Sequence, residues 1–226
     1  EQHEGTAILV SGLGSSAGIE SVATGSSDIG TSSRELKDAE LELGLTDTPV
    51  AYDAIAVIVN PDNPVKELST MQVRAIFAGV ITNWSEVGGP DMEIGLVNRD
   101  EASGTREAFH KIVMDDARFD RGAVVLPGTG QVRAVVAQVE GAIGYISLGF
   151  VNDEVRAIAI DGVEPSEETV VSGDYPIQRT LHFFTKGEVS DATRDYIDYV
   201  LSPEVQDVIV REAGFIPITA KEVPGD

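Results

Sequence analysis

Short apolar stretches alternate along the chain with stretches in which apolar positions recur every three or four residues. The continuous apolar stretches predict short, mostly buried strands. They span residues 6–12, 54–60, 93–98, 142–147, 155–160 and 180–184. The periodic stretches predict helices at 69–77, 105–114, 131–139, 191–201 and 203–213. Strands that alternate with helices favour an α/β fold with largely parallel sheets.

The beginning of the chain does not fit a complete α/β sheet. Residues 1–5 resemble the end of a helix and a turn that leads directly into the strand predicted at 6–12. An α/β sheet rarely begins in this way, so an earlier strand and helix are expected to be missing.

Three loops of small polar residues each have the pattern of a strand end followed by the start of a helix. They span residues 12–18, 28–35 and 98–106. In the second loop, Ser32 and Glu35 fit the S-x-x-E capping box of a helix N-terminus. The pattern therefore predicts three helix N-termini that begin with serine or glycine.

Helix N-termini of this kind can bind a small oxyanion. Their first backbone N–H groups lack partners within the helix and carry partial positive charge. Glycine lets a ligand approach the backbone, serine and threonine hydroxyls add donors, and Arg99 could supply a charge-assisted contact. Taken singly, each serine is more often a simple cap and each arginine a surface residue. Only the three loops together favour an anion site.

The composition narrows the choice of ligand and chemistry. The 226 residues include 38 Asp and Glu against 16 Lys and Arg, a formal net charge of −22 that opposes nucleic acid and anionic membranes. The interpretation we favour is a solvated acidic surface, since no calcium loop is present and the histidines, His3, His110 and His182, are scattered. Cysteine is absent, which excludes disulfides and thiolate chemistry. No apolar run approaches the roughly 20 residues of a membrane-spanning helix.

The first loop also permits a different interpretation. The residues Gly12, Gly14 and Ala17 match the dinucleotide-binding pattern G-x-G-x-x-A. However, the helix expected after Ala17 breaks at residues 25–27, too early for the βαβ unit that this pattern needs. Ser103 lies in A-S-G-T and not in a G-x-S-x-G elbow, and no activated nucleophile is apparent. The sequence thus predicts a protein that is not an enzyme and has no cofactor.

The loops, taken in order, resemble the phosphate-binding proteins of ABC phosphate importers. The resemblance covers nearly the whole chain and includes the words GVITNW and SGTR. It is carried by residues 10–36, 55–89, 96–109, 140–151 and 201–218.

This resemblance implies a two-lobe α/β fold of the periplasmic-binding-protein type (type II) that closes by a hinge over one phosphate. The first lobe would comprise residues 1–53 and 180–226, the second lobe residues 54–179, with crossovers near 52–54 and 178–180. The resemblance also implies phosphate-binding residues in both lobes: Ser15, Ser33, Arg99, Ser103, Gly104 and Thr105. Supporting residues would be Ser16, Ser32, Arg34 and Glu101, with Glu101 orienting Arg99.

Two departures from the family pattern lead to further expectations. Many members carry an aspartate, which accepts the proton of hydrogen phosphate, where this chain has Ser33; Arg34 would add positive charge instead. Members also begin with a strand, a loop and a helix that this chain lacks. We therefore expect this chain alone to bind phosphate weakly or not at all, and its first lobe to expose a sheet edge that could pair with another molecule.

The expected function is the capture of inorganic phosphate outside the cytoplasm and its delivery to a membrane ABC permease. A monomer is expected, with a lipid anchor a further option in the precursor, and nucleic acid is not expected as a partner. Two alternatives remain open: a binder of another oxyanion such as sulfate, and a phosphate sensor or interaction protein with a degenerate site.

Overall fold

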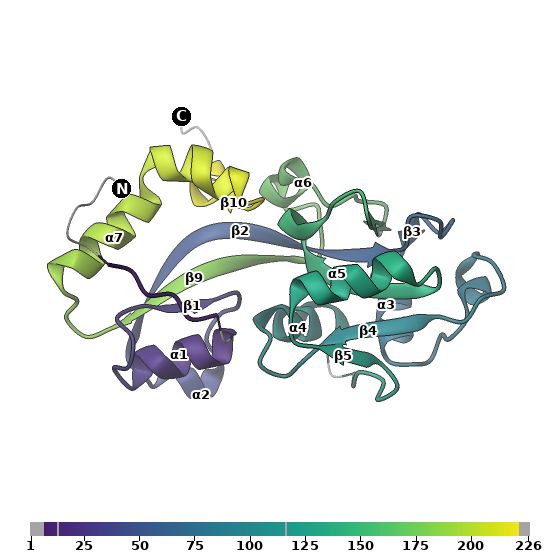
Figure 1. The fold of residues 1–226 in the computed structure, drawn as a ribbon, viewed down its shortest axis with the longest axis horizontal. Helices are drawn as coiled ribbons and strands as arrows, with labels where there is room; N and C mark the ends of the chain where they lie inside the picture. The colour runs from purple at the N-terminus through teal and green to yellow at the C-terminus, as the bar shows by residue number, and fades with distance from the viewer. Residues whose placement is uncertain (1–6, 13, 116, 222–226) are drawn as a thin grey trace.

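The computed structural model describes residues 7–12, 14–115 and 117–221. It consists of two α/β lobes joined by β2 (Leu45–Val59) and β9 (Gln178–Lys186), as Figure 1 shows. Strand β2 passes through both lobes, and β9 returns the chain from the second lobe to the first. The two-lobe α/β fold with two crossovers expected from the sequence is confirmed.

The first lobe, on the left in Figure 1, is built from both ends of the described chain. Its strands, besides β2 and β9, are β1 (Gly30–Ser32) and β10 (Ile216–Pro217). Its helices are α1 (Ser15–Ala23), α2 (Asp38–Leu41), α7 (Asp191–Leu201) and a π-helical turn at Val205–Val210.

The second lobe contains the middle of the chain. Its strands are β3 (Glu67–Leu68), β4 (Gly95–Arg99), β5 (Val124–Leu126), β6 (Ala142–Ser147), β7 (Arg156–Ala157) and β8 (Ala159–Ile160). Its helices are α3 (Thr70–Phe77), α4 (Gly104–Phe109), which continues as a π-helical turn at His110–Met114, α5 (Thr129–Gln138) and α6 (Glu167–Ser172). Short 3₁₀ turns lie at Trp84–Val87, Leu148–Phe150 and Ile218–Lys221.

One continuous sheet connects the lobes, in the strand order β1-β9-β2-β6-β4-β5 among the described residues. The expectation of largely parallel sheets was wrong. Parallel pairing is found between β4 and β5, β4 and β6, and β3 and β8, whereas β2 pairs antiparallel with β6, β7, β9 and β10. The reason is geometric: β2 carries the chain out of the first lobe and β9 brings it back, so adjacent crossovers must run in opposite directions.

Strand β2 changes its partner at the junction of the lobes. Residues 45–54 pair with β9, and residues 55–59 pair with β6. The residues of β2 from Asp53 to Val59 are all buried, which explains why this stretch reads as a continuous apolar strand. The change between Ala54 and Ile55 lies beside the lobe boundary expected at residues 53 and 54, which itself stays a prediction.

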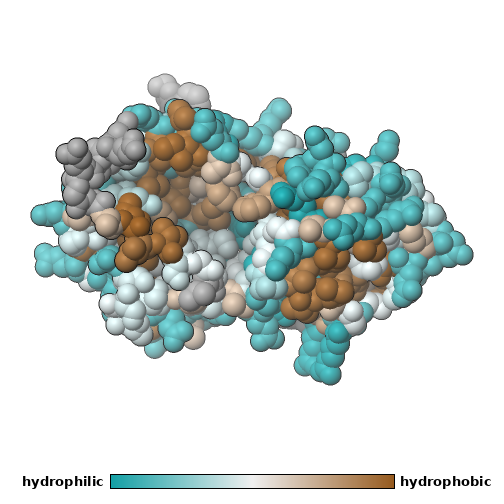
Figure 2. All heavy atoms as spheres, in the orientation of Figure 1, coloured by the Kyte–Doolittle hydropathy of each residue, from teal (hydrophilic) through white to brown (hydrophobic). Residues whose placement is uncertain are grey.

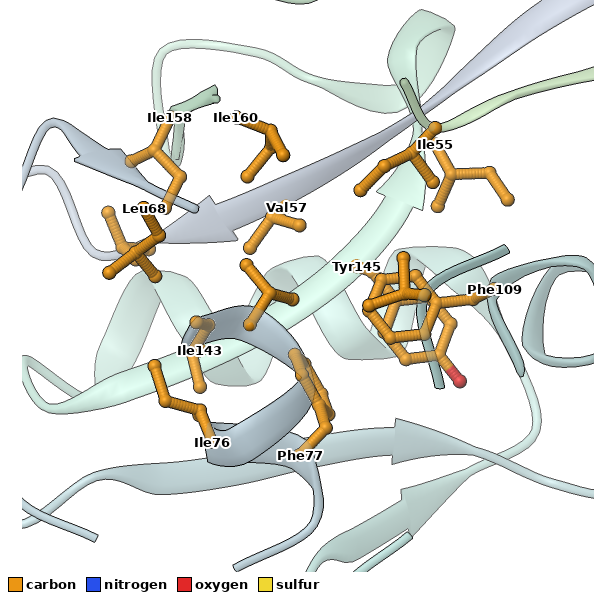
Figure 3. Close-up of a cluster of buried hydrophobic side chains, with 14 of the residues drawn as sticks. Ile55, Val57, Leu68, Ile76, Phe77, Phe109, Ile143, Tyr145, Ile158 and Ile160 are labelled. Atoms are coloured by element: carbon orange, nitrogen blue, oxygen red, sulfur yellow. The ribbon is translucent and has the colours of Figure 1, made fainter. Parts of the chain in front are cut away.

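The larger hydrophobic core belongs to the second lobe, and Figure 3 shows it between α3, α4 and the sheet. Phe77 lies edge-on to Phe109 and Tyr145, with ring centroids 5.1 and 5.5 Å apart. Phe109 in turn stacks on Tyr145 with centroids 4.0 Å apart. These rings anchor α4 to β6, and so fix the helix whose N-terminus faces the first lobe.

Truncating Phe77 should test this anchoring. We expect Phe77→Ala to lower the free energy of unfolding by about 3–5 kcal/mol, because a fully buried ring is removed and a cavity remains. Urea denaturation followed by circular dichroism measures the change. Phe150→Ala removes a ring that is 42% exposed and should cost far less. Equal losses in the two variants would contradict the assignment.

Most of the predicted helices are confirmed, whereas the first predicted strand was wrong. Residues 191–201 and 142–147 form α7 and β6 with the expected bounds. The helix expected at 203–213 contains a π-helical turn at Val205–Val210. Residues 7–12 form no strand, and Ile8, Leu9 and Val10 are exposed instead of buried in a sheet. The helix end expected at residues 1–5 lies outside the described residues.

Hydrophilic side chains surround both lobes in Figure 2, in keeping with the net charge of −22. Apolar side chains gather on this face over α5 and β5, where Val124 and Val125 are exposed. In the described part of the chain, no helix is both long and apolar enough to cross a membrane.

Candidate functional site

The first serine loop begins α1 as predicted. Gly14 precedes the helix with φ of 94°, a left-handed conformation that glycine adopts without strain. Ser15 is buried at the first helical position, and its Oγ accepts a hydrogen bond from the backbone N–H of Ser33 at 3.0 Å. The hydroxyls of Ser15 and Ser33 lie 3.2 Å apart. Two residues predicted to bind the anion are therefore neighbours in the first lobe.

The second serine loop does not begin a helix, so the capping box predicted for Ser32 and Glu35 was wrong. Ser32 ends β1, which pairs with β9, and its hydroxyl donates to the carbonyl oxygen of Arg34 at 2.7 Å. The next helix, α2, begins later, at Asp38. Strand pairing outcompetes the local capping motif here, and Glu35 forms an ion pair with Lys111 instead.

The third loop begins α4 as predicted. Ser103 caps the helix, because its Oγ accepts from the backbone N–H of Arg106 at 3.2 Å. Ser103, Gly104 and Thr105 are all buried. Three adjacent predicted binding residues thus lie at one helix N-terminus in the second lobe, where free N–H groups and partial positive charge favour an anion.

The helix N-termini of the two lobes meet. A methyl group placed on Gly104 would lie 2.0 Å from Oγ of Ser15 and 2.5 Å from Oγ of Ser33. A methyl group on Gly14 would lie 2.4 Å from the carbonyl oxygen of Ala102. Only glycine permits this approach, and Figure 1 shows α1 and α4 on the two sides of the junction. The sequence-predicted residues of both lobes are therefore brought together.

Arg99 ends β4 beside this junction. Its Nη1 donates to Oγ1 of Thr129 at 3.0 Å and its Nη2 donates to the carbonyl oxygen of Pro127 at 2.8 Å. The buried Nε has no hydrogen-bond partner, and among the described residues no carboxylate lies within 4.0 Å of the guanidinium. Burial lowers the pKa of Arg99 from its usual value. An arginine without a counter-ion, held in place by neutral groups, is suited to an anionic ligand.

The supporting roles predicted for Glu101 and Arg34 stay predictions, and the structure places the two residues in different surroundings. Glu101 is exposed and forms no ion pair with Arg99, both being described residues, and the hydrogen bonds of Arg99 go to Thr129 and Pro127. Arg34 is buried but already paired, with Glu40 at 2.7 Å and with Glu107 at 2.6 Å. Burial would lower the pKa of Arg34, but the two carboxylates together raise it above its usual value. The positive charge of Arg34 is therefore neutralised by these two carboxylates.

Ser16, the remaining supporting residue, lies close to the same arginine. Its Oγ accepts a hydrogen bond from Nη2 of Arg34 at 3.4 Å. Ser16 thus helps to position Arg34 under α1.

Glu107 of α4 links the lobes by ion pairs. It contacts Arg34 at 2.6 Å and Lys37 at 2.9 Å, and both cations belong to the first lobe. A second pair across the junction joins Lys111 to Glu35 at 2.7 Å. The exposed Lys111 pair contributes little, so the interaction of Glu107 with the buried Arg34 is the main electrostatic link beside the site.

Sequence reasoning missed a second arginine at the junction, Arg179 of β9. Its Nη1 donates to Oγ1 of Thr105 at 2.8 Å. Its Nε and Nη2 donate to Oδ2 of Asp53 at 2.9 and 2.7 Å. Two signals could have found the pair: Arg179 is the only Lys or Arg between Arg156 and Lys186, and Asp53 interrupts an apolar strand.

The described residues contain no group of three or more His, Asp or Glu side chains that could hold a metal ion. The arrangement at the junction consists instead of hydroxyls, backbone N–H groups and guanidiniums, which are donors to an oxyanion. These are the elements of a solute-binding site between two lobes.

Comparisons with known proteins agree with this class. The PBP superfamily domain matches residues 1–204. Phosphate-binding protein PstS of Bacillus subtilis is 38% identical over the whole chain, which covers 76% of that protein. The chain belongs to the PstS family of phosphate-binding proteins.

Solved structures give the same result. A substrate-binding protein from Clostridium perfringens, crystallised with bound phosphate, is 41% identical with a TM-score of 0.88; the match covers 91% of this chain and 85% of that one. An ABC-type phosphate transport receptor from Vibrio cholerae is 31% identical with a TM-score of 0.83, covering 95% and 90% of the two chains.

Proposed function

We propose that this chain captures inorganic phosphate outside the cytoplasm and delivers it to the permease of an ABC importer. The observation that carries the proposal is the convergence of Ser15, Ser33 and the α4 N-terminus beside Arg99, whose guanidinium has no carboxylate partner among the described residues. The bound phosphate would accept hydrogen bonds from these groups, and closure of the lobes would bury it. Members of this family bind solutes, and the site residues need no catalytic role.

The proposal is compatible with the acidic surface. The distant carboxylates are screened by salt over roughly 8–10 Å, whereas the helix N-termini and Arg99 lie at the ligand itself. We propose a monomeric receptor that functions in the periplasm or at the cell surface. As an alternative to a freely diffusing receptor, a lipid anchor on the precursor would attach it to the membrane.

Calorimetric titration with phosphate and then sulfate tests the proposal. Saturable heat with phosphate and a clearly weaker response to sulfate would support a phosphate receptor. Preference for sulfate would favour the alternative oxyanion. No heat with either anion, from a chain shown to be folded by circular dichroism, would match the expectation that this chain alone binds phosphate weakly or not at all. The titration is then repeated with the chain extended at its N-terminus. No heat from that chain would contradict the proposal and favour a sensor or interaction protein with a degenerate site.

The ion pairs of Glu107 should contribute to closure. We expect Glu107→Gln to weaken phosphate binding about threefold to tenfold, because removing a carboxylate beside the buried Arg34 destabilises the closed arrangement by about 1 kcal/mol. Calorimetry measures the affinity. Glu154→Gln removes a pair with Arg133 inside the second lobe and should leave the affinity unchanged. Equal effects of both variants would contradict a role in closure.

A further inference from the structure

Arg179 lies at the point where β9 leaves the second lobe, and its guanidinium contacts both lobes. Its Nη1 donates to Oγ1 of Thr105 at the N-terminus of α4 and lies 3.5 Å from the carbonyl oxygen of Ser33. Thr105 and Ser33 are both predicted binding residues from opposite lobes. The same Nη1 group therefore lies between the two halves of the anion site.

Asp53 orients the guanidinium of Arg179 by an ion pair and two hydrogen bonds. It is the only buried Asp or Glu in the described part of the chain, although the sequence contains 38 acidic residues. Its Oδ2 accepts hydrogen bonds from both Nε and Nη2 of Arg179, and its Oδ1 accepts a hydrogen bond from the hydroxyl of Ser147 at 2.7 Å. Burying a carboxylate is costly unless it is paired and hydrogen-bonded. The contacts leave Nη1 as the edge of the guanidinium directed at the site.

The two arginines of the junction are close enough for their charges to interact. After burial, which is the largest cause, the positive charge of Arg179 contributes to the lowered pKa of Arg99. Arg99 has no carboxylate within 4.0 Å among the described residues, whereas Arg179 is neutralised by Asp53. The site thus combines one uncompensated charge with one rigid donor that is already oriented.

We propose that Arg179, oriented by Asp53, is a second arginine ligand of the bound oxyanion, contributed by the crossover strand and not by either serine loop. The proposal rests on the proposed function and adds a binding residue to the same site. In the bound state, the hydroxyl of Thr105 accepts from Nη1 and donates its own proton to the ligand, so the contact with Thr105 need not break. Because the pair with Asp53 is preformed, little side-chain entropy is lost on binding.

A crystal structure of the chain with phosphate gives the direct test. We expect a nitrogen of Arg179 within about 2.7–3.2 Å of a phosphate oxygen, the range of a charge-assisted hydrogen bond. A bound phosphate with every nitrogen of Arg179 more than about 4 Å from its oxygens would overturn the proposal. In that case the pair with Asp53 would only connect the crossovers.

Calorimetry on Arg179→Lys gives a second test. Lysine retains the positive charge but cannot contact Asp53 and the ligand through a fork, so phosphate affinity should fall about tenfold or more. Arg133→Lys is the matched control, since Arg133 pairs with Glu154 inside the second lobe. Unchanged affinity of Arg179→Lys relative to the wild type would contradict the proposal.

The outcomes separate this inference from the proposed function. If neither the wild-type chain nor the chain extended at its N-terminus binds phosphate, the proposed function fails. If the wild-type chain binds phosphate and Arg179→Lys binds equally well, only the assignment of Arg179 fails. If Arg179→Lys does not fold, as judged by circular dichroism, the wild-type crystal structure alone decides.

Discussion

Replacing Gly104 with alanine should weaken phosphate binding by about one to two orders of magnitude and leave the chain folded. The added methyl group would lie 2.0 Å from Oγ of Ser15, 2.5 Å from Oγ of Ser33 and 2.8 Å from Cβ of Ser15. The hydroxyls could rotate, but the Cβ atom of Ser15 could move only with its backbone. Overpacking of this kind costs about 1–3 kcal/mol, and each 1.4 kcal/mol is a tenfold change in affinity.

The clash disappears when the lobes separate. The added methyl group should therefore lower the phosphate affinity, which needs closed lobes, and leave the stability of the ligand-free chain unchanged. Alanine is also the better helix former at this position. Titration calorimetry measures the affinity and thermal denaturation of the ligand-free chain measures the stability. Gly130→Ala is the control, because nothing lies within 4 Å of its added methyl group and it too begins a helix. If Gly104→Ala bound phosphate as tightly as Gly130→Ala, the lobes would not close in the way described.

The second large effect is expected for Arg99→Gln. Loss of the guanidinium should reduce phosphate affinity roughly 30- to 1,000-fold, corresponding to about 2–4 kcal/mol for a charge pair with a desolvated partner. The stability of the ligand-free chain should stay the same or rise. Arg99 is partly desolvated without a carboxylate within 4.0 Å among the described residues, and glutamine removes that uncompensated charge.

Measuring both quantities makes the expected result specific. If Arg99 only stabilised the fold, its replacement would lower the melting temperature and would change the phosphate affinity little. Arg133→Gln serves as the comparison, because Arg133 is bonded to Phe150 and Glu154 within the second lobe. A drop in stability of Arg99→Gln with preserved affinity would assign Arg99 to the scaffold.

The sequence allowed prediction of those helix starts at the candidate site that depend on local chemistry. Ser103 caps α4 through a hydrogen bond that spans three residues, and Gly14 and Ser15 begin α1 as the loop composition indicated. Where a distant partner decides the structure, prediction failed. Ser32 has the composition of a cap, but the pairing of β1 with β9, about 150 residues further along, makes it the end of a strand.

The pair of Asp53 and Arg179 could not be predicted for the same reason, since its partners are distant in the sequence. They are 126 residues apart, and neither belongs to a recognisable motif. An aspartate within an apolar strand and an isolated arginine at the start of another could each have been exposed at a sheet edge. Only the antiparallel register of β2 and β9, which places Asp53 opposite Arg179, turns the two anomalies into one buried pair. The same antiparallel crossovers explain why the expectation of largely parallel sheets was wrong.

The passage of β2 through both lobes has a consequence for how the molecule unfolds. Its first ten residues complete the sheet of one lobe, and its last five belong to the sheet of the other. No single cut in the chain can therefore release either lobe as a contiguous piece with an intact sheet. Melting of one lobe removes hydrogen-bond partners from a strand that the other lobe needs. The two halves are thus coupled in folding through the shared strand β2.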